Sequence, residues 1–152
     1  MIHRTVLLNL FIFLACMTRA HSQSEPLNVN SQKTFYPDST RACDPATIFT
    51  IVEEMPQYTG GMRQLGKDLK ESLELKADVN GFLFLNVSIN CEGRAFAFQV
   101  IRTVNAETDQ NIIDALAKLQ NWKAGKQRGK LIDCNHTVAV KIKNGEIEVL
   151  GK

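Results

Sequence analysis

Apolar residues recur with helical spacing in two stretches of the chain. In the first stretch, which follows Gly60 and Gly61, they recur at steps of three and four: Met62, Leu65, Leu69 and Leu73. The second stretch follows Asn105, a residue typical of a helix N-cap, and its stripe consists of Ile112, Ile113, Leu116 and Leu119. These stripes predict amphipathic helices over residues 62–74 and from Asn105 to about Gln120.

Alternation of apolar and polar residues predicts three main strands, over residues 82–90, 95–104 and 137–143. A glycine-bearing turn at residues 91–94 joins the first two strands as a hairpin. The apolar face of the first strand consists of Leu83, Leu85, Val87 and Ile89.

Two weaker segments flank these strands. Residues 47–55 are apolar and end at Pro56, which predicts a short extended segment at a sheet edge. Asn144-Gly145 is a strong hairpin turn, and Ile147 and Val149 alternate beyond it. A short final strand is therefore expected to fold back on the third main strand.

The connections between these elements restrict the sheet topology. A crossover helix makes the second and third strands parallel, so an all-antiparallel sheet requires the third strand to lie beside the first. We expect an α+β fold in which two helices pack on a small antiparallel sheet with strand order 2-1-3. A register with Leu85 opposite Val140 aligns the apolar faces and also places Cys91 opposite Cys134. We therefore predict a Cys91–Cys134 disulfide, with free thiols as the alternative, and Cys43 is left over.

The N-terminal residues are typical of a secretory signal peptide over residues 1–22. Arg4 precedes an apolar run over residues 6–17, and small residues follow it. A transmembrane helix needs about 17 to 25 apolar residues, so an uncleaved anchor fits less well. Lipid attachment at Cys16 is also disfavoured, because the residues before it match a lipoprotein signal poorly. We expect an exported protein of the periplasm or cell envelope, with a polar leader over residues 23–47 and one domain over residues 48–150.

Removal of the signal peptide leaves the chain without net charge. The chain has 18 Lys and Arg and 16 Asp and Glu, and the signal peptide contains Arg4, Arg19 and no acid, which leaves 18 − 2 = 16 bases and 16 acids. A neutral chain has no general attraction for nucleic acid or anionic lipid, so neither is expected as the main partner. The cysteines lack metal-ligand spacing and His136 is the only histidine after residue 22, so we expect no metal and no cofactor.

Four motifs resemble the C-terminal domain of the TonB family, and most closely its Bacteroidetes-type variants. They are Val52-Glu53-Glu54-Met55-Pro56, Gly60-Gly61, Asn90-Cys91-Glu92-Gly93 and the basic, glycine-punctuated loop from Trp122 to Lys130. The resemblance covers residues 49–143. It departs from the family at Ala124, where a proline is usual, and between Leu73 and Gly81, where a Tyr-Pro segment is nearly absent. The chain also lacks the family's transmembrane helix and proline-rich spacer, so it is not expected to couple an inner-membrane motor itself.

The resemblance implies a protein-binding module that is connected with transmembrane transport. In the family, the last strand is an exposed edge that pairs with a partner strand, here an outer-membrane receptor or a periplasmic protein. The corresponding edge consists of Thr137, Val138, Ala139, Val140, Lys141, Ile142 and Lys143. The alternative is a protected edge, because its lysines discourage pairing and the Asn144-Gly145 turn could fold the chain's own tail over it.

Two other functions fit the sequence. One is an envelope scaffold that self-associates as a homodimer through this edge or through Cys43. The other is a surface module that binds anionic glycan through Lys123, Lys126, Arg128 and Lys130. No catalytic site and no small-molecule substrate are expected, because no nucleophile, base and orienting group converge, and Glu53 and Glu54 would point to opposite faces of a strand.

Overall fold

A computed structural model describes residues 34–35 and 42–151. The predicted signal peptide, Cys16 and most of the predicted polar leader lie outside these residues. Within residues 34–35 and 42–151, no helix is long and apolar enough to cross a membrane.

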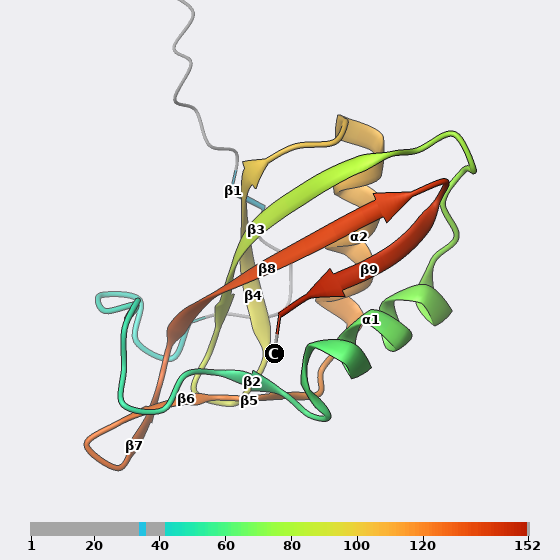
Figure 1. The fold of residues 1–152 in the computed structure, drawn as a ribbon. Helices are drawn as coiled ribbons and strands as arrows, with labels where there is room; N and C mark the ends of the chain where they lie inside the picture. The colour runs from blue at the N-terminus through green and yellow to red at the C-terminus, as the bar shows by residue number, and fades with distance from the viewer. Residues whose placement is uncertain (1–33, 36–41, 152) are drawn as a thin grey trace, which may run out of the picture. The chain divides into compact units, whose positions relative to one another are not determined.

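The fold is α+β, with two helices and a five-stranded antiparallel sheet (Figure 1). The order across the sheet is β1 (Thr34–Phe35), β4 (Ala95–Arg102), β3 (Gly81–Ile89), β8 (Cys134–Lys143) and β9 (Glu146–Leu150). The helices are α1 (Gly61–Ser72) and α2 (Ala106–Lys118). The three main strands have the predicted order, as β4-β3-β8. The sheet has five strands rather than the three of the predicted order: β9 is the short final strand that was expected to fold back on the third main strand, and β1 extends the other side without having been predicted.

Two small ladders lie outside this sheet. β2 (Gln57–Tyr58) pairs with β5 (Trp122–Lys123), and β6 (Gly125–Gln127) forms a hairpin with β7 (Lys130–Ile132). The sequence predicted this region only as a loop between the second helix and the third strand. In the structure the loop is itself a short hairpin.

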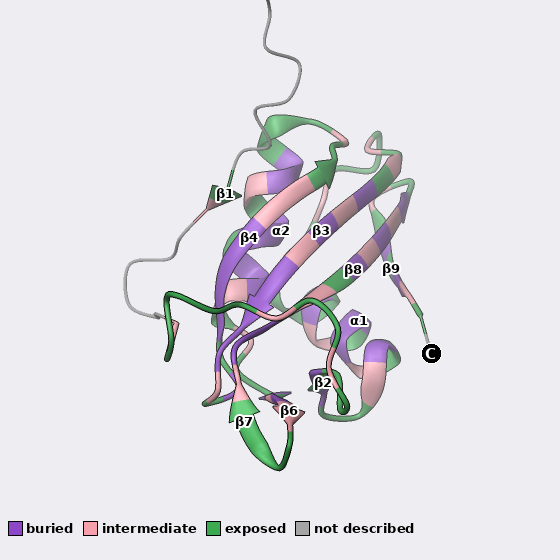
Figure 2. Cartoon of the chain, turned by 90° about the vertical axis from the view of Figure 1, so that its left-hand side faces the viewer, coloured by how far each residue is buried: buried purple, intermediate pink, exposed green. Residues whose placement is uncertain are grey.

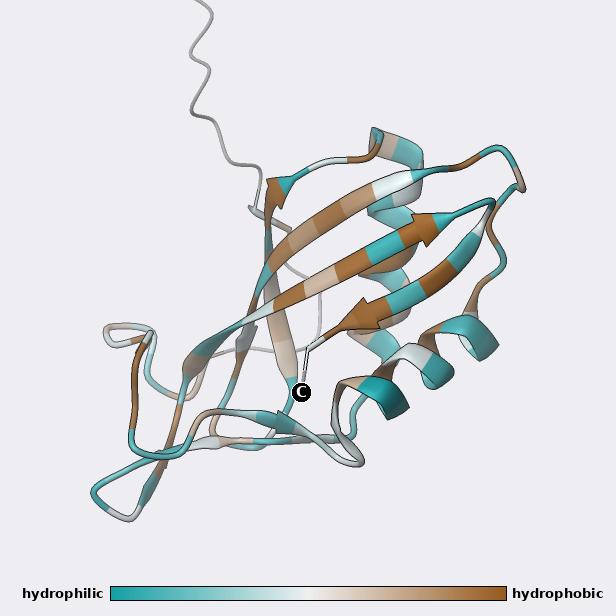
Figure 3. Ribbon diagram, viewed as in Figure 1, coloured by the Kyte–Doolittle hydropathy of each residue, from teal (hydrophilic) through white to brown (hydrophobic). Residues whose placement is uncertain are grey.

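One apolar core holds the sheet and the helices together. Buried and more exposed residues alternate along β8 (Figure 2), and apolar and polar residues alternate with them (Figure 3). The core joins Leu85 and Val140 of the sheet to Leu69 of α1 and Leu116 of α2, all of them almost completely buried. The predicted helical stripes and strand alternation are therefore confirmed as the faces that build the core.

The N-termini of the two helices are capped in different ways. Asn105 caps α2 as predicted, because its side-chain oxygen accepts a hydrogen bond from the backbone N–H of Thr108 at 2.8 Å. Helix α1 has no such side-chain cap, and Gly60 enters it with a φ of 86°. Gly66, in the middle of α1, brings the helix close to β9, since a Cβ on it would lie 3.5 Å from the backbone nitrogen of Val149.

The register between β3 and β8 differs from the prediction by two residues. Leu85 lies opposite Val138 rather than Val140, and Ile89 lies opposite Cys134. A shift of two residues keeps every side chain on its face of the sheet, so the apolar pattern fits both registers equally well.

This register corrects the predicted Cys91–Cys134 disulfide. Cys134 lies within β8, is fully buried and remains a free thiol, and burial raises its pKa. Cys91 lies just beyond the end of β3 and is bonded to Cys43, with a Cα–Cα distance of 6.0 Å. Cys43 is therefore not the unpaired cysteine. The segment that carries it is held against the domain at Phe49, which exchanges backbone hydrogen bonds with Asp133 and Asn135.

Candidate functional site

The strand predicted as an exposed binding edge lies inside the sheet. β8 pairs with β3 on one side, and on the other side Ala139 to Lys143 pair with β9 from Leu150 to Glu146. Lys141, one of the lysines expected to discourage pairing at this edge, forms an ion pair with Glu148 of β9 at 3.3 Å. The prediction of a free edge at residues 137–143 is corrected, because the chain's own last strand occupies most of it.

The cations predicted as anion contacts lie around the β6–β7 hairpin: Lys123, Lys126, Arg128 and Lys130. Lys126 is paired with Glu54, with its Nζ 3.2 Å from a carboxylate oxygen, and the backbones of these two residues also exchange hydrogen bonds. Arg128 lies at the hairpin tip, where its backbone N–H donates to Glu53 at 2.9 Å. The hairpin is thus fixed to residues 53–54, a segment more than 70 positions away in the sequence.

A groove of about 590 Å³ lies where these segments meet. Its lining comes from three parts of the chain: Glu53, Glu54, Met55 and Gln57; Cys91 and Glu92 in the β3–β4 turn; and Trp122, Lys123, Ala124, Lys126 and Leu131. Two large apolar side chains on its walls are open to solvent, Met55 at 39% and Leu131 at 53% exposure. The fold therefore gathers residues of three of the four resemblance motifs around one depression, and Gly60-Gly61 is the motif that does not line it.

The charged residues that line the groove are three acids, Glu53, Glu54 and Glu92, and two lysines, Lys123 and Lys126. Each acid of its lining is engaged: Glu53 with the Arg128 backbone, Glu54 with Lys126, and Glu92 with Arg94 at 3.7 Å. Among the described residues, by contrast, no acidic group pairs with the side chains of Lys123, Arg128 and Lys130. Of these three cations, Lys123 lines the groove, whereas Arg128 and Lys130 lie outside its lining, on the adjoining β6–β7 hairpin.

Trp122 is a buried residue of the groove lining. Its indole is 6% exposed and makes edge-to-face contacts with Tyr58 and His136, at centroid distances of 5.2 and 5.7 Å. Its Nε1–H is buried and has no hydrogen-bond partner among the described residues. Burial lowers the pKa of His136, which keeps the imidazole neutral beside the indole.

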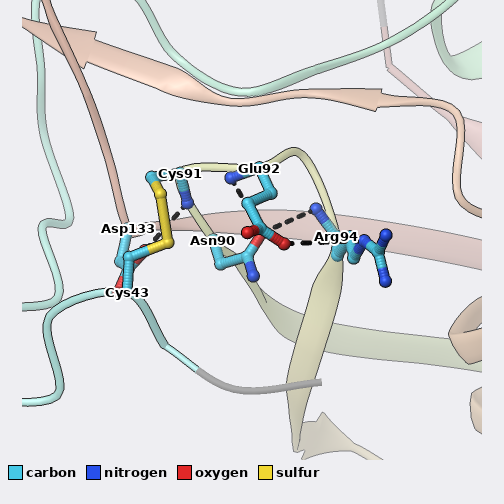
Figure 4. A network of polar contacts seen from close by, with 6 residues as sticks. All are labelled: Cys43, Asn90, Cys91, Glu92, Arg94 and Asp133. Carbon is cyan, nitrogen blue, oxygen red and sulfur yellow. Dashed lines mark hydrogen bonds and ion pairs between the residues drawn. A yellow bond between two sulfur atoms is a disulfide. The ribbon is translucent and has the colours of Figure 1, made fainter. Parts of the chain in front are cut away.

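The β3–β4 turn forms another wall, and Asn90 holds it in shape. The Asn90 side-chain oxygen accepts hydrogen bonds from the backbone N–H groups of Glu92 and Arg94, at 3.1 and 2.9 Å (Figure 4). Gly93 then has a φ of 76°, and a Cβ on it would lie 2.3 Å from the carbonyl oxygen of Trp122. A glycine is needed here both for the left-handed backbone and for the close approach to β5.

Behind this turn, the Cys43–Cys91 disulfide lies beside the carboxylate of Asp133 (Figure 4). Asp133 is 2% exposed, and its two oxygens accept hydrogen bonds from the backbone N–H groups of Asp44 at 2.9 Å and Cys91 at 2.8 Å. The disulfide and the hydrogen bonds of the Asp133 carboxylate connect three separate segments, which are residues 43–44, the β3–β4 turn and the start of β8.

Sequence reasoning found the basic residues of this site but not its apolar walls or the disulfide. Met55 lies in a motif recognised only through the resemblance, and Leu131 lies just beyond the loop that was singled out. Glu53 and Glu54 both line the groove, although a regular strand would have separated them, because the chain bends there instead of continuing as a strand. No local pattern in the sequence indicates that the carboxylate of Asp133 is buried.

A scan against protein-family models finds no match for this chain, and neither the curated proteins nor the solved structures include a significant match.

Proposed function

We propose that this protein is an exported binding module that holds a polypeptide segment of another envelope protein in the groove between Met55 and Leu131. The observation that carries the proposal is the combination of two exposed apolar side chains in the groove with three nearby cations of the loop, Lys123 in the lining and Arg128 and Lys130 on the adjoining hairpin, which have no acidic partner among the described residues. Apolar anchors surrounded by polar groups are the usual composition of a protein-binding surface. The complementary partner is a segment that carries apolar and acidic residues together.

The site supports binding better than catalysis. The groove is lined by acids, lysines, amide and apolar side chains, and the only sulfur nucleophile in its lining, Cys91, is held in a disulfide. No Ser, Thr or His belongs to that lining. A nucleophile with an adjacent base, which acyl or phosphoryl transfer requires, is therefore not provided by the groove residues.

The resemblance to the TonB C-terminal family supports an outer-membrane receptor or a periplasmic protein as the partner. Strand addition on residues 137–143 is not part of this proposal, since β9 pairs there. The partner would contact side chains in the groove instead. A role in TonB-dependent transport remains an expectation of the resemblance.

Peptide selection with matched variants tests the proposal. Linear peptides from a phage-displayed library would be selected on the purified protein and measured by calorimetry against Leu131→Asp and Ile101→Asp. These positions are 53% and 52% exposed, and Ile101 lies on β4 outside the groove. We expect acidic, apolar-rich peptides whose affinity falls at least about 10-fold with Leu131→Asp and little with Ile101→Asp.

The same peptides should shift the NMR signals of the Met55 methyl group and of the Trp122 indole N–H. Equal losses of affinity in both aspartate variants, or selected peptides that leave the Met55 signal unchanged, would refute the groove as the binding site.

Anionic glycan is the second candidate, and it is favoured by Lys123, Arg128 and Lys130, whose side chains pair with no acid in the part of the chain that the structure describes. A polyanion needs these cations but not the apolar walls. A sulfated polysaccharide that binds the wild type, loses affinity with Lys130→Glu and keeps it with Met55→Gln would support this candidate over a polypeptide. Self-association through an intermolecular disulfide of Cys43 is not supported, because Cys43 is bonded to Cys91 of the same chain. The free thiol of Cys134 is buried and cannot replace it.

A further inference from the structure

The two disulfide cysteines and Asp133 form the one group of potential metal ligands among the described residues. The sulfur atoms of Cys43 and Cys91 and a carboxylate oxygen of Asp133 all lie within 4.8 Å of one another. We propose that reduction of the Cys43–Cys91 disulfide converts this group into a zinc site with two thiolate ligands and one carboxylate ligand.

The positions of the three groups fit the size of such a site. Zinc binds thiolate sulfur at about 2.3 Å and carboxylate oxygen at about 2.0–2.2 Å, so its tetrahedral ligands lie roughly 3.5–3.8 Å apart. The upper limit of 4.8 Å exceeds this spacing by about 1 Å, so side-chain movements of about that size bring the oxygen of Asp133 within reach of a zinc ion shared with both sulfurs. Reduction lets the two sulfurs separate, and Cys43 is exposed and can adjust.

The surroundings of Asp133 already orient its carboxylate. Each oxygen accepts one backbone hydrogen bond, from Asp44 or from Cys91, which leaves a second lone pair on each oxygen for a metal. Such outer hydrogen bonds are typical of carboxylates that bind metals. Asp133 is also 2% exposed, so a bound cation would offset the negative charge of a carboxylate that is almost inaccessible to water.

The chemistry balances with a dithiol reductant. The reductant's two thiols form its own disulfide, and the Cys43–Cys91 bond becomes two thiols. Zinc then displaces both thiol protons and binds the thiolates and the Asp133 carboxylate, with a water molecule as the fourth ligand. Two soft sulfur ligands favour zinc over magnesium or calcium. Disulfide and zinc are therefore alternative occupants of the same position.

Metal titration of the full chain tests this inference. Protein reduced with a phosphine and then freed of it under nitrogen would be titrated with zinc against a chromophoric chelator, and with cadmium to detect thiolate charge-transfer absorption. We expect one zinc per reduced chain and no binding by the oxidised chain. Cys43→Ser should lower the affinity at least about 10-fold, and Asp133→Asn should lower it while thiolate absorption persists.

Cys134→Ser is the matched control, because Cys134 is the free thiol among the described cysteines and is no ligand in the proposed site. It should bind zinc like the wild type. The inference is overturned if the reduced wild type binds no more tightly than Cys43→Ser, or if Cys134→Ser abolishes binding. Cys43→Ser is the decisive variant, because Cys43 is exposed and its replacement removes a ligand without disturbing the core. Circular dichroism of this variant checks that the comparison is made on folded protein.

Discussion

Replacing Gly93 with alanine should destabilise the protein much more than the same replacement at Gly129. Both glycines have left-handed backbones, with φ of 76° and 73°, so each alanine incurs a similar conformational cost of about 1 to 2 kcal/mol. The sites differ in what the new methyl group meets. A Cβ at Gly93 would lie 2.3 Å from the carbonyl oxygen of Trp122, whereas at Gly129 no described atom lies within 4 Å.

The difference in magnitude follows from this contact. A Cβ closer than 3.0 Å to a backbone atom must be relieved by movement, here of the β3–β4 turn away from β5. Overpacking of this kind typically costs about 1 to 3 kcal/mol, in addition to the backbone cost. We therefore expect Gly93→Ala to lower the free energy of unfolding by about 2 to 5 kcal/mol, and Gly129→Ala by about 1 to 2 kcal/mol.

Urea denaturation followed by tryptophan fluorescence measures both values, because Trp122 is the single tryptophan of the chain and lies at the affected contact. The midpoint should fall with little change in slope. If Gly93→Ala loses no more stability than Gly129→Ala, the turn is not packed against β5, and the described wall of the groove is wrong.

Four further predictions concern the core, the cross-link and pH. Trp122→Phe should cost less than about 2 kcal/mol, because it also removes the unpartnered buried N–H, whereas Trp122→Ala should cost about 3 to 5 kcal/mol; equal costs in urea would contradict this. The Cys43→Ser, Cys91→Ser double variant should lose up to about 4 kcal/mol in urea, the chain-entropy value for a sequence separation of 48. Gly66→Ala should raise the melting temperature, since its Cβ meets only ordinary contacts and alanine favours helix by up to about 1 kcal/mol; a lower melting temperature would show that α1 packs more tightly on β9 than described. Burial lowers the pKa of His136 in the folded state, so stability should fall as pH drops below about 6.5, where the unfolded state takes up the proton first; His136→Asn should remove this part of the slope.

The core of the fold could be predicted from the sequence because its signals are periodic. Helical stripes and strand alternation identified both helices and the three main strands, and the crossover rule fixed their order. The register could not be predicted, because a two-residue shift leaves the apolar faces aligned. The incorrect Cys91–Cys134 pairing followed directly from that shift, since a disulfide prediction of this kind is only as good as the register behind it.

The candidate site was less predictable because irregular segments build it. Residues 42–56 have no period, and their position depends on the Cys43–Cys91 bond, the Asp133 carboxylate and the bridge between Glu54 and Lys126. Each of these contacts joins positions more than 40 residues apart. Local patterns identify residues suited to binding, but they carry no information on which distant segments face each other.

The composite origin of the groove also determines when it forms during folding. Its walls come from residues between Glu53 and Gln57, from Cys91 and Glu92, and from residues between Trp122 and Leu131, so it requires closure of two long loops. Such non-local contacts form late, because the entropy of loop closure must be overcome before they stabilise anything. The β3–β4 hairpin can assemble from nearer neighbours, whereas the groove, like the pairing of β3 with β8, needs distant segments of the chain. A nascent chain that ends before Leu131 cannot present the complete groove, so any ligand of this surface would select for molecules whose chain is complete to that point.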